Sequence, residues 1–325
     1  MGEKRYYVSC PYKGFSGGPH LCHQLCKMLN DLGINAKMHY YDWETLIVDW
    51  KDVNDTVFGK YNTTHVTDIN ELDSEDSIII FPETKWYLPK AFDHAKTHMW
   101  WMSVFYYEWT TDWFDKEVND WFRNDYAKNG DSIHFVQSQY AYDYCLNTLE
   151  IPEHRIQFLS DYIDEIFTED FKEQKRENIV FYNPNKMSDI QTKLIEMETG
   201  INWVAIENMA SEEVRDSFRH GKVYVDFGNH PGKDRIPREA ASCGCCIITN
   251  REGAAANDKD VRIPKKYKIK DVSDIDNILN TINYCLENFD ECTSDFDNYR
   301  KWIKDEKKRF KTEVKRFISL TKGDM

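Results

Sequence analysis

The sequence lacks several features that would place it in a common class of protein. No apolar run approaches the roughly 18 residues that a membrane-spanning helix needs. No internal repeat and no low-complexity tract is present. Positive charge is in deficit, because 42 Lys and Arg residues are outnumbered by 56 Asp and Glu residues. The resulting net charge of −14 argues against a general nucleic-acid binder.

Paired metal-binding cysteine spacings are also missing among the nine cysteines. The cysteines of residues 243–246 lie in an apolar, strand-like context, which favours buried free thiols. Cys22, His23 and Cys26 could share one helix, but such side chains pack more often than they bind zinc. The opening MGEKRYYVSC has no apolar core of signal-peptide length. We therefore expect no metal site and a reducing, cytoplasmic environment.

The length and the local patterns indicate two α/β domains. A chain of 325 residues with 41% hydrophobic and 30% charged residues suits two globular domains of about 150 residues each. Residues 6–10, 20–32 and 35–41 read as strand, helix and strand, with apolar residues at helical spacing in the second segment. Such a βαβ unit makes a parallel sheet. Further strands are predicted at residues 77–81, 99–107 and 133–137.

A second α/β series follows a passage of acidic and mixed charge at residues 151–175. We predict a first domain at residues 1–166 and a second at 167–325, the latter ending in a helix at 297–320. The expected fold is thus two doubly wound, Rossmann-like domains that face a cleft. The predicted elements of the second domain are strands at 178–182, 203–206, 223–227 and 245–248 and helices at 186–199, 211–219, 237–243 and 275–288.

One stretch, FGNHPGKDRIPREAASCGCCIIT at residues 227–249, points to chemistry. Its loop enters a predicted helix that starts at Pro237, so free N–H groups face the edge of the sheet where ligands bind. Lys233 and Arg235 beside those N–H groups suit a phosphate. Glu239 would repel that phosphate at close range but could accept hydrogen bonds from sugar hydroxyls. In the alternative interpretation, Glu239 caps its own helix and pairs with Arg235 or Arg238.

The same stretch resembles the donor-binding segment of GT-B glycosyltransferases of the family-four type. The resemblance rests on VYVDFG, NHPGKDRIP, REAASCG, CCIIT and NREGAAA, and it covers most of the chain. The segments SGGPHLCHQL, IIIFPET, MWWMSV, FLSDYI and HPGKDRIPREAA are similar to those of bacterial glycosyltransferases of cell-surface polysaccharide clusters. The resemblance implies a GT-B fold whose terminal helix crosses back to the first domain.

The resemblance also implies residue roles. Glu239 would bind the donor ribose, a glycine loop from the first domain would approach the diphosphate, and Lys186 would supply a basic group to the phosphates. Gly253 with Ala254 stands in the place of a commoner Gly-Gly pair near the donor. The complete set of expected donor-binding residues is Gly17, Gly18, Lys186, Gly232, Lys233, Arg235, Glu239, Gly253 and Ala254.

One departure concerns the group beside the transferred sugar. The family often has a second glutamate eight residues before the ribose-binding one, and this position is Pro231 here. The candidates for acid or base are therefore His230, Asp234 and Glu83, and the stereochemical outcome stays open, with retention as the expectation. No Asp-x-Asp triplet follows a predicted buried strand, so we expect a metal-independent, hexosyltransferase-like enzyme without a cofactor.

The expected activity is transfer of a sugar from a nucleotide-sugar donor to a glycan or lipid-linked acceptor in surface polysaccharide synthesis. The alternative is a non-catalytic nucleotide-sugar-binding or scaffold paralogue. The aromatic residues of 100–114 could stack on sugar rings, although most are expected to pack in the core. The lysine-rich tail either docks on the first domain or touches anionic lipid at the inner membrane face.

Overall fold

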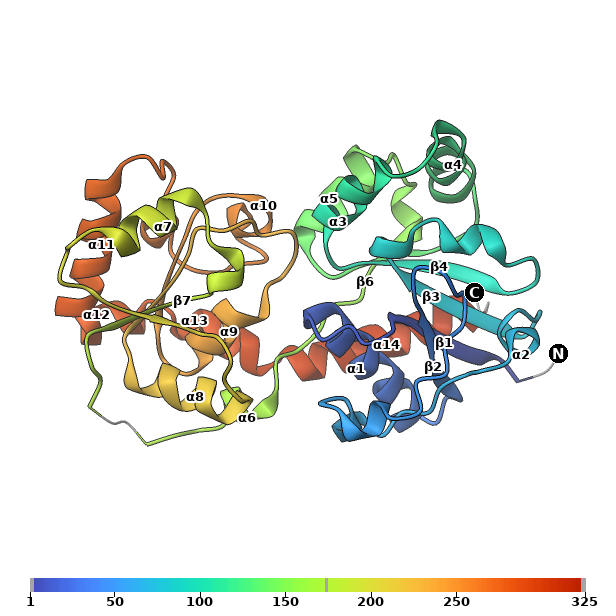
Figure 1. The fold of residues 1–325 in the computed structure, drawn as a ribbon, viewed down its shortest axis with the longest axis horizontal. Coiled ribbons are helices and arrows are strands. Elements are labelled where there is room, and N and C mark those ends of the chain that lie inside the picture. The colour runs from blue at the N-terminus through green and yellow to red at the C-terminus, as the bar shows by residue number, and fades with distance from the viewer. Residues whose placement is uncertain (1–2, 173–174, 323–325) are drawn as a thin grey trace. The chain divides into compact units, whose positions relative to one another are not determined.

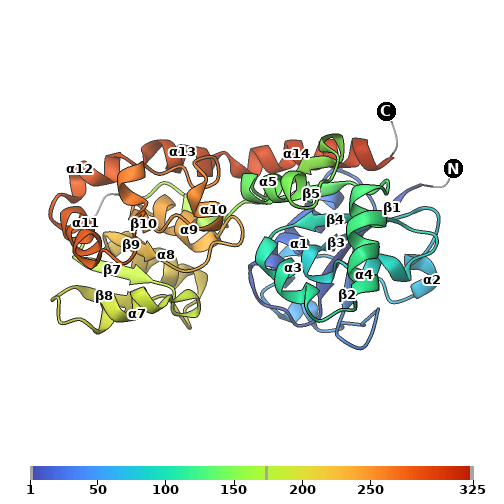
Figure 2. The same ribbon diagram turned by 90° about the horizontal axis from the view of Figure 1, so that it is seen from above.

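A computed structural model describes residues 3–172 and 175–322 (Figure 1). The chain forms two compact units, one ending at Asp161 and resuming at Lys308, the other running from Tyr162 to Lys307. Each unit has its own parallel β-sheet with helices, which confirms the predicted α/β class with two doubly wound parts (Figure 2). None of the described helices combines the length and apolar character that crossing a membrane requires.

The sheet of the first unit has six parallel strands in the order β2-β1-β3-β4-β5-β6. Because β1 pairs with both β2 and β3, the strand order reverses between β1 and β3. Ligands bind at such reversals, beyond the carboxyl ends of the strands. The strands are β1 (Arg5–Pro11), β2 (Ala36–Tyr41), β3 (Ser77–Pro82), β4 (Lys96–Trp101), β5 (His134–Val136) and β6 (Ile156–Phe158).

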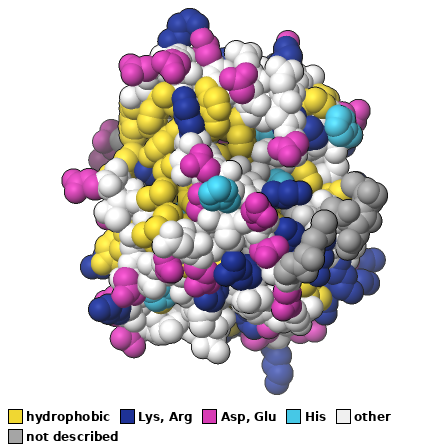
Figure 3. Space-filling model, turned by 90° about the vertical axis from the view of Figure 1, so that its right-hand side faces the viewer, with side chains coloured by type: hydrophobic (Ala, Val, Ile, Leu, Met, Phe, Trp, Pro, Cys, Tyr) yellow, Lys and Arg dark blue, Asp and Glu magenta, His cyan; other side chains and the backbone are white. Residues whose placement is uncertain are grey.

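Helices cover both faces of this sheet. Because successive strand residues point to opposite faces, Tyr6 and Tyr7 of β1 pack against different helices. Tyr7 belongs to a core shared with Val104 and Tyr107 of α3, whereas Tyr6 contacts Phe317 of the C-terminal helix, with ring centroids 5.7 Å apart. Figure 3 shows hydrophobic side chains gathered in the upper left part of one face. The helices are α1 (Gly17–Asp31), α2 (Ile69–Leu72), α3 (Val104–Thr111), α4 (Lys116–Asp120), a π-helical segment (Trp121–Lys128) and α5 (Gln139–Asn147).

The second unit has a four-stranded parallel sheet in the order β10-β9-β7-β8, and the strand order reverses between β7 and β9. Its strands are β7 (Ile179–Tyr182), β8 (Asn202–Ala205), β9 (Val223–Asp226) and β10 (Cys246–Thr249). Its helices are α6 (Glu165–Thr168), α7 (Asp189–Glu196), α8 (Ser211–His220), α9 (Arg235–Ser242), α10 (Gly253–Ala256), α11 (Ile275–Glu287), α12 (Phe289–Ser294) and α13 (Asp297–Lys304).

Two of the predictions for residues 99–175 are corrected. The strand predicted at 99–107 ends as β4 at Trp101, and Val104 begins α3. A continuous apolar run fits a strand or a helix equally well, so periodicity could not separate the two elements. The passage predicted at 151–175 contains the short strand β6, whose three residues are too few to show an alternating pattern.

The C-terminal segment returns to the first unit, as the resemblance implied. It consists of two helices, α13 and α14 (Glu306–Lys322), where the sequence predicted one. From Lys308 onward α14 belongs to the first unit, and its apolar side chains Phe310, Val314 and Phe317 are buried. The Glu313 carboxylate accepts hydrogen bonds from the backbone N–H and the hydroxyl of Ser160 at 2.7 and 2.6 Å.

Candidate functional site

The candidate site of the second unit lies where β7 and β9 end side by side in the middle of the sheet. Lys186 ends the short turn after β7, and residues 227–234 connect β9 to α9. The neighbours on the far sides are β8 and β10, so the chain leaves β7 and β9 in opposite directions. This geometry opens the carboxyl edge of the sheet to a ligand.

Close backbone approaches hold the loop after β9. A Cβ atom on Gly228 would lie 2.1 Å from the carbonyl oxygen of Lys186, and one on Gly253 would lie 2.0 Å from that of His230. Gly253 also has φ +49°, a conformation that favours glycine. The backbone N–H of Ala254 donates to the same His230 carbonyl at 2.9 Å. The Gly253–Ala254 pair therefore supports the loop through backbone contacts.

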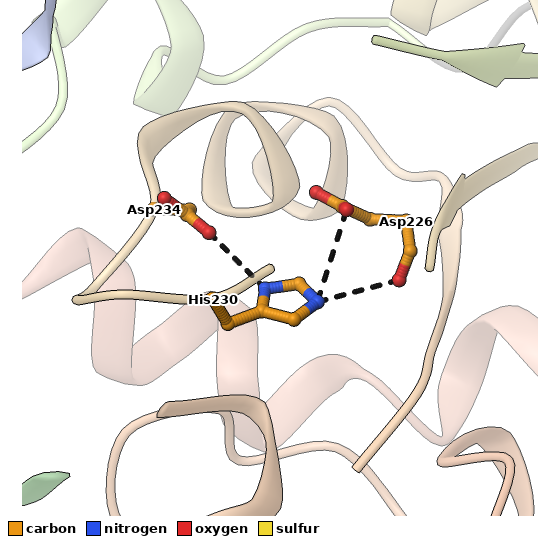
Figure 4. Close-up of side chains that lie close together, drawn as sticks. All are labelled: Asp226, His230 and Asp234. Atoms are coloured by element: carbon orange, nitrogen blue, oxygen red, sulfur yellow. Dashed lines mark hydrogen bonds and ion pairs between the residues drawn. The ribbon is translucent and has the colours of Figure 1, made fainter. Parts of the chain in front are cut away.

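His230 lies between two carboxylates (Figure 4). Its Nδ1 is 3.1 Å from Oδ2 of Asp234, and its Nε2 is 3.4 Å from the carbonyl oxygen and 3.8 Å from Oδ1 of Asp226. The Lys186 ammonium then donates to Oδ1 of Asp234 at 2.5 Å and to the carbonyl of Asn229 at 3.3 Å. These contacts join the ends of β7 and β9 through one charged network.

The network sets the protonation of its members. Burial alone would lower the pKa of His230, but the hydrogen bond to Asp234 and the charge of Asp226 outweigh burial and raise it. Burial would raise the pKa of Asp234, yet His230 and Lys186 lower it overall. Burial dominates at Asp226, whose pKa is raised. His230 thus favours the imidazolium form and Asp234 the carboxylate.

Asp226, His230 and Asp234 also form the one group in the described residues with the geometry of a metal site, since one ligand atom from each lies within 4.8 Å of the others. The ammonium of Lys186 already neutralises Asp234, and both ring nitrogens of His230 are occupied by oxygen atoms. A divalent cation here would be repelled by Lys186. The donor set therefore fits an internal salt-bridge network better than a metal.

The predicted phosphate-binding cations differ in how far their side chains are exposed to solvent. The side chain of Lys186 is 29% exposed and that of Arg235 is 14% exposed, whereas that of Lys233 is 4% exposed. The Lys233 ammonium lies 3.0 Å from Oε1 of Glu306, and Arg238 donates to Oε2 of the same carboxylate at 2.7 Å. Lys233 is thus engaged in a buried ion pair at the start of α14.

Glu239 lies on the first turns of α9, which begins two residues earlier than predicted. Pro237 is the third helical residue and is tolerated because the first four N–H groups of a helix have no partner within it. The Glu239 side chain is buried, with Oε1 at 3.4 Å from Nε of Arg235. The N-cap residue is Asp234 and makes no side-chain capping bond. Burial raises the pKa of Glu239 despite Arg235 and Arg238.

The other predicted site residues lie in both units. Gly232 is buried in the loop after β9. Gly17 and Gly18 begin α1 after β1, and Glu83 directly follows β3, so all three lie at the strand reversal of the first sheet. The Glu83 side chain is 1% exposed, and its Oε2 accepts the N–H of Met102 at 2.8 Å. Burial raises its pKa to about 8.

Two charged residues of this region escaped the sequence analysis. Asp226 is the last residue of the apolar strand VYVD. An acidic residue at the carboxyl end of a buried strand could have marked it as part of the site. Glu306 gave no local signal, because it is one charge among many in a lysine-rich tail and lies 68 positions from Arg238. Its role depends on how distant segments pack.

The architecture and the site define a known class of fold. The chain matches no protein-family model and no curated protein. It is similar over nearly its whole length to solved structures of glycosyltransferases with two Rossmann-like domains, and it therefore has the GT-B fold.

Three of these structures illustrate the likeness. HepE of Anabaena, in complex with UDP-glucose, has a TM-score of 0.69 at 10% identity and covers 97% of this chain and 99% of its own. A glycosyltransferase of Rickettsia africae has a TM-score of 0.68 at 10% identity, with 98% of each chain covered. WaaG, a glycosyltransferase involved in lipopolysaccharide biosynthesis, has 0.60 at 10% identity, covering 98% and 100%.

A first prediction concerns Glu83. Because burial raises its folded pKa to about 8, the folded state binds a proton that the unfolded state releases above about pH 4.5. Stability is therefore lost as pH rises from about 5 to 8, and Glu83→Gln removes this loss. Relative to the wild type, the variant should gain about 3 kcal/mol across that range.

Thermal or urea unfolding followed by tryptophan fluorescence measures this difference, since eight of the ten tryptophans lie between residues 43 and 121. Glu117→Gln, at an exposed carboxyl group, is the matched control and should leave the pH profile unchanged. Parallel profiles for Glu83→Gln and the wild type would contradict the burial argument. Loss of sugar transfer at unchanged fold would instead assign Glu83 a direct chemical role.

Proposed function

We propose that the chain transfers a sugar from a nucleotide-sugar donor to a glycan or glycolipid acceptor in surface polysaccharide synthesis. The observation that carries this proposal is the accessible cation Lys186, held at the carboxyl edge of the second sheet by Asp234. The GT-B fold supports it, as do the complex of HepE with UDP-glucose and the role of WaaG in lipopolysaccharide biosynthesis.

The nucleotide diphosphate is the leaving group of such a reaction. When the bond between the anomeric carbon and the phosphate oxygen breaks, negative charge accumulates on the diphosphate. Lys186 and Arg235, the two most exposed cations of the site, and the free N–H groups at the start of α9 would stabilise that charge. Glu239 would accept hydrogen bonds from the ribose hydroxyls, and Lys233 would position the loop through Glu306.

His230 is better suited to positioning than to proton exchange with a substrate. It is almost completely buried, and each ring nitrogen faces an oxygen of Asp226 or Asp234. Its positive charge offsets the two carboxylates and keeps Asp234 directed at Lys186. The retained acid or base candidates Asp234 and Glu83 differ in access, since the Asp234 side chain is partly exposed and Glu83 is not.

Glu239→Gln tests donor binding. The substitution keeps the side-chain volume, so the melting temperature should barely change. Losing one charge-assisted hydrogen bond to the ribose should weaken nucleotide binding by about ten- to a hundredfold. Calorimetric titration with UDP-, GDP-, CMP- and dTDP-sugars measures the affinity, with Glu212→Gln at an exposed site as the control.

Each result of this titration has a distinct meaning. Unaltered affinity in the folded Glu239 variant would remove Glu239 from the donor site. Failure of the wild type to bind any sugar nucleotide would overturn the proposed function. Binding without hydrolysis or transfer, for every donor and acceptor tried, would favour the non-catalytic paralogue.

Metal independence is tested by chelation. Since Lys186 occupies the position of a cation beside Asp234, EDTA should leave sugar transfer or donor hydrolysis nearly unchanged. Lys186→Met should reduce turnover at least about tenfold, a loss of roughly 1.4 kcal/mol of transition-state stabilisation. Lys193→Met, which removes an exposed charge on α7, is the control and should keep full turnover. A large loss with EDTA that Mn²⁺ or Mg²⁺ restores would refute this account.

A peripheral membrane contact is proposed for α14. The apolar face of this helix is already buried in the first unit, so attraction to lipid would be electrostatic. Lys308, Lys311, Lys315 and Arg316 are exposed. At about 1 kcal/mol for each charge near an anionic surface, Lys311→Gln with Lys315→Gln should weaken binding to phosphatidylserine vesicles about thirtyfold at low salt.

Co-sedimentation with vesicles measures this effect, and vesicles of neutral lipid serve as the control. The double variant should keep the wild-type melting temperature, because both side chains are exposed. Equal binding of variant and wild type, or no binding of the wild type, would exclude a membrane role for α14.

A further inference from the structure

Five large aromatic side chains are exposed together on the first unit. Trp43 follows β2, and the other four lie on α3 and the turn after it. Each is between 45% and 71% exposed. We refer to these residues as the aromatic strip: Trp43, Phe105, Tyr106, Trp109 and Trp113.

The rings of the aromatic strip form a continuous series. Trp43 lies 5.7 Å from Trp113, and Trp113 lies 4.5 Å from Trp109, between ring centroids. Tyr106 is 6.3 Å from Trp109 and 5.9 Å from Phe105. Exposed apolar side chains that occur singly need no explanation, but a contiguous patch of this kind marks a binding surface.

The position of the strip is that of a ligand site. Trp43 follows the carboxyl end of β2, and α3 follows the carboxyl end of β4. In a parallel sheet these ends share one edge, which also carries Gly17, Gly18 and Glu83 at the strand reversal. Ligands of open α/β sheets bind at this edge.

The charges around the strip restrict its partner. Four exposed acidic residues flank the rings, Asp42 and Glu44 beside Trp43 and Glu108 and Asp112 on the α3 side. One nearby cation, Lys85, is buried, with Nζ 3.6 Å from the centroid of Trp43 and 2.9 Å from the Tyr87 hydroxyl oxygen. Lys116, three residues after Trp113, is exposed and pairs with Asp120, so the acidic residues next to the rings outnumber the cations. An anionic lipid surface or an anionic polymer would meet this acidic rim and be repelled.

We propose that the aromatic strip binds a glycan chain that carries no negative charge, as the acceptor of the sugar transfer proposed above. The faces of sugar rings expose apolar C–H groups that pack on Trp and Tyr rings. The hydroxyl groups at the ring edges can donate to carboxylates such as Glu108 and Asp112. The acceptor role rests on the proposed function, whereas glycan binding does not.

The experiment uses a double variant that carries both Trp109→Ala and Trp113→Ala in the 325-residue chain. Its control is Tyr284→Ala, which removes an exposed aromatic residue of the second unit. The probes are neutral hexose and N-acetylhexosamine oligosaccharides and a uronic-acid oligosaccharide of matched length. Binding is measured by calorimetry, and donor hydrolysis without acceptor is measured in parallel.

Neutral oligosaccharides should bind the wild type and the Tyr284 variant alike, and the uronic-acid chain should bind neither. The double variant should lose at least about tenfold in affinity, or about 1.4 kcal/mol. Its donor hydrolysis should remain unchanged. If no chain binds a sugar nucleotide or shows hydrolysis or transfer while glycan binding persists, the proposed function is contradicted and the glycan site still stands.

Several results would overturn the proposal. Equal glycan affinity of the double variant and the wild type, or no glycan binding by the folded wild type, would exclude the strip as a glycan site. Vesicle binding that the double variant alone loses would assign the strip to a membrane. A concentration-dependent dimer that the double variant abolishes would assign it to self-association.

Discussion

The loop between β9 and α9 carries several ionisable groups into the interior of the second unit, and their pairing is the constraint on which the candidate site depends. An isolated buried charge costs several kcal/mol, so each group needs a partner of opposite sign. Asp234 forms ion pairs with His230 on one side and with Lys186 on the other. Glu306 in turn lies between Lys233 and Arg238.

These two pairings give similar residues different tasks. Lys233 was predicted as a phosphate ligand from its loop, and Lys186 from the resemblance. In the structure Glu306 pairs with Lys233 in the interior, whereas Lys186 stays partly exposed to solvent. The carboxylate of Glu306 also connects the loop to the helix that continues into the first unit. In the proposed sugar transfer, a loop fixed in this way would present its cations to the diphosphate with little reorganisation, which lowers the barrier of an electrostatically stabilised step.

Ligands of open parallel sheets bind at the carboxyl edge, and the candidate residues of both units lie at this edge. In the first unit the same edge carries the Gly17–Gly18 loop, Glu83 and the aromatic strip. The aromatic residues of 100–114 divide accordingly. Trp100, Trp101 and Tyr107 are fully buried, and those of α3 that belong to the strip are exposed. A core and a binding surface thus arise from one aromatic segment.

The sequence by itself determined the elements whose signals are local. Apolar residues at helical spacing in residues 20–32 located α1 (Gly17–Asp31). Alternating strands and helices determined the class of fold, and the resemblance of the 227–249 stretch indicated a donor site. The tertiary structure alone decided what depends on distant segments: the burial of Glu83 and the pairing of Lys233 with Glu306. Burial and partner choice are set by residues far apart in the chain, and no local pattern records them.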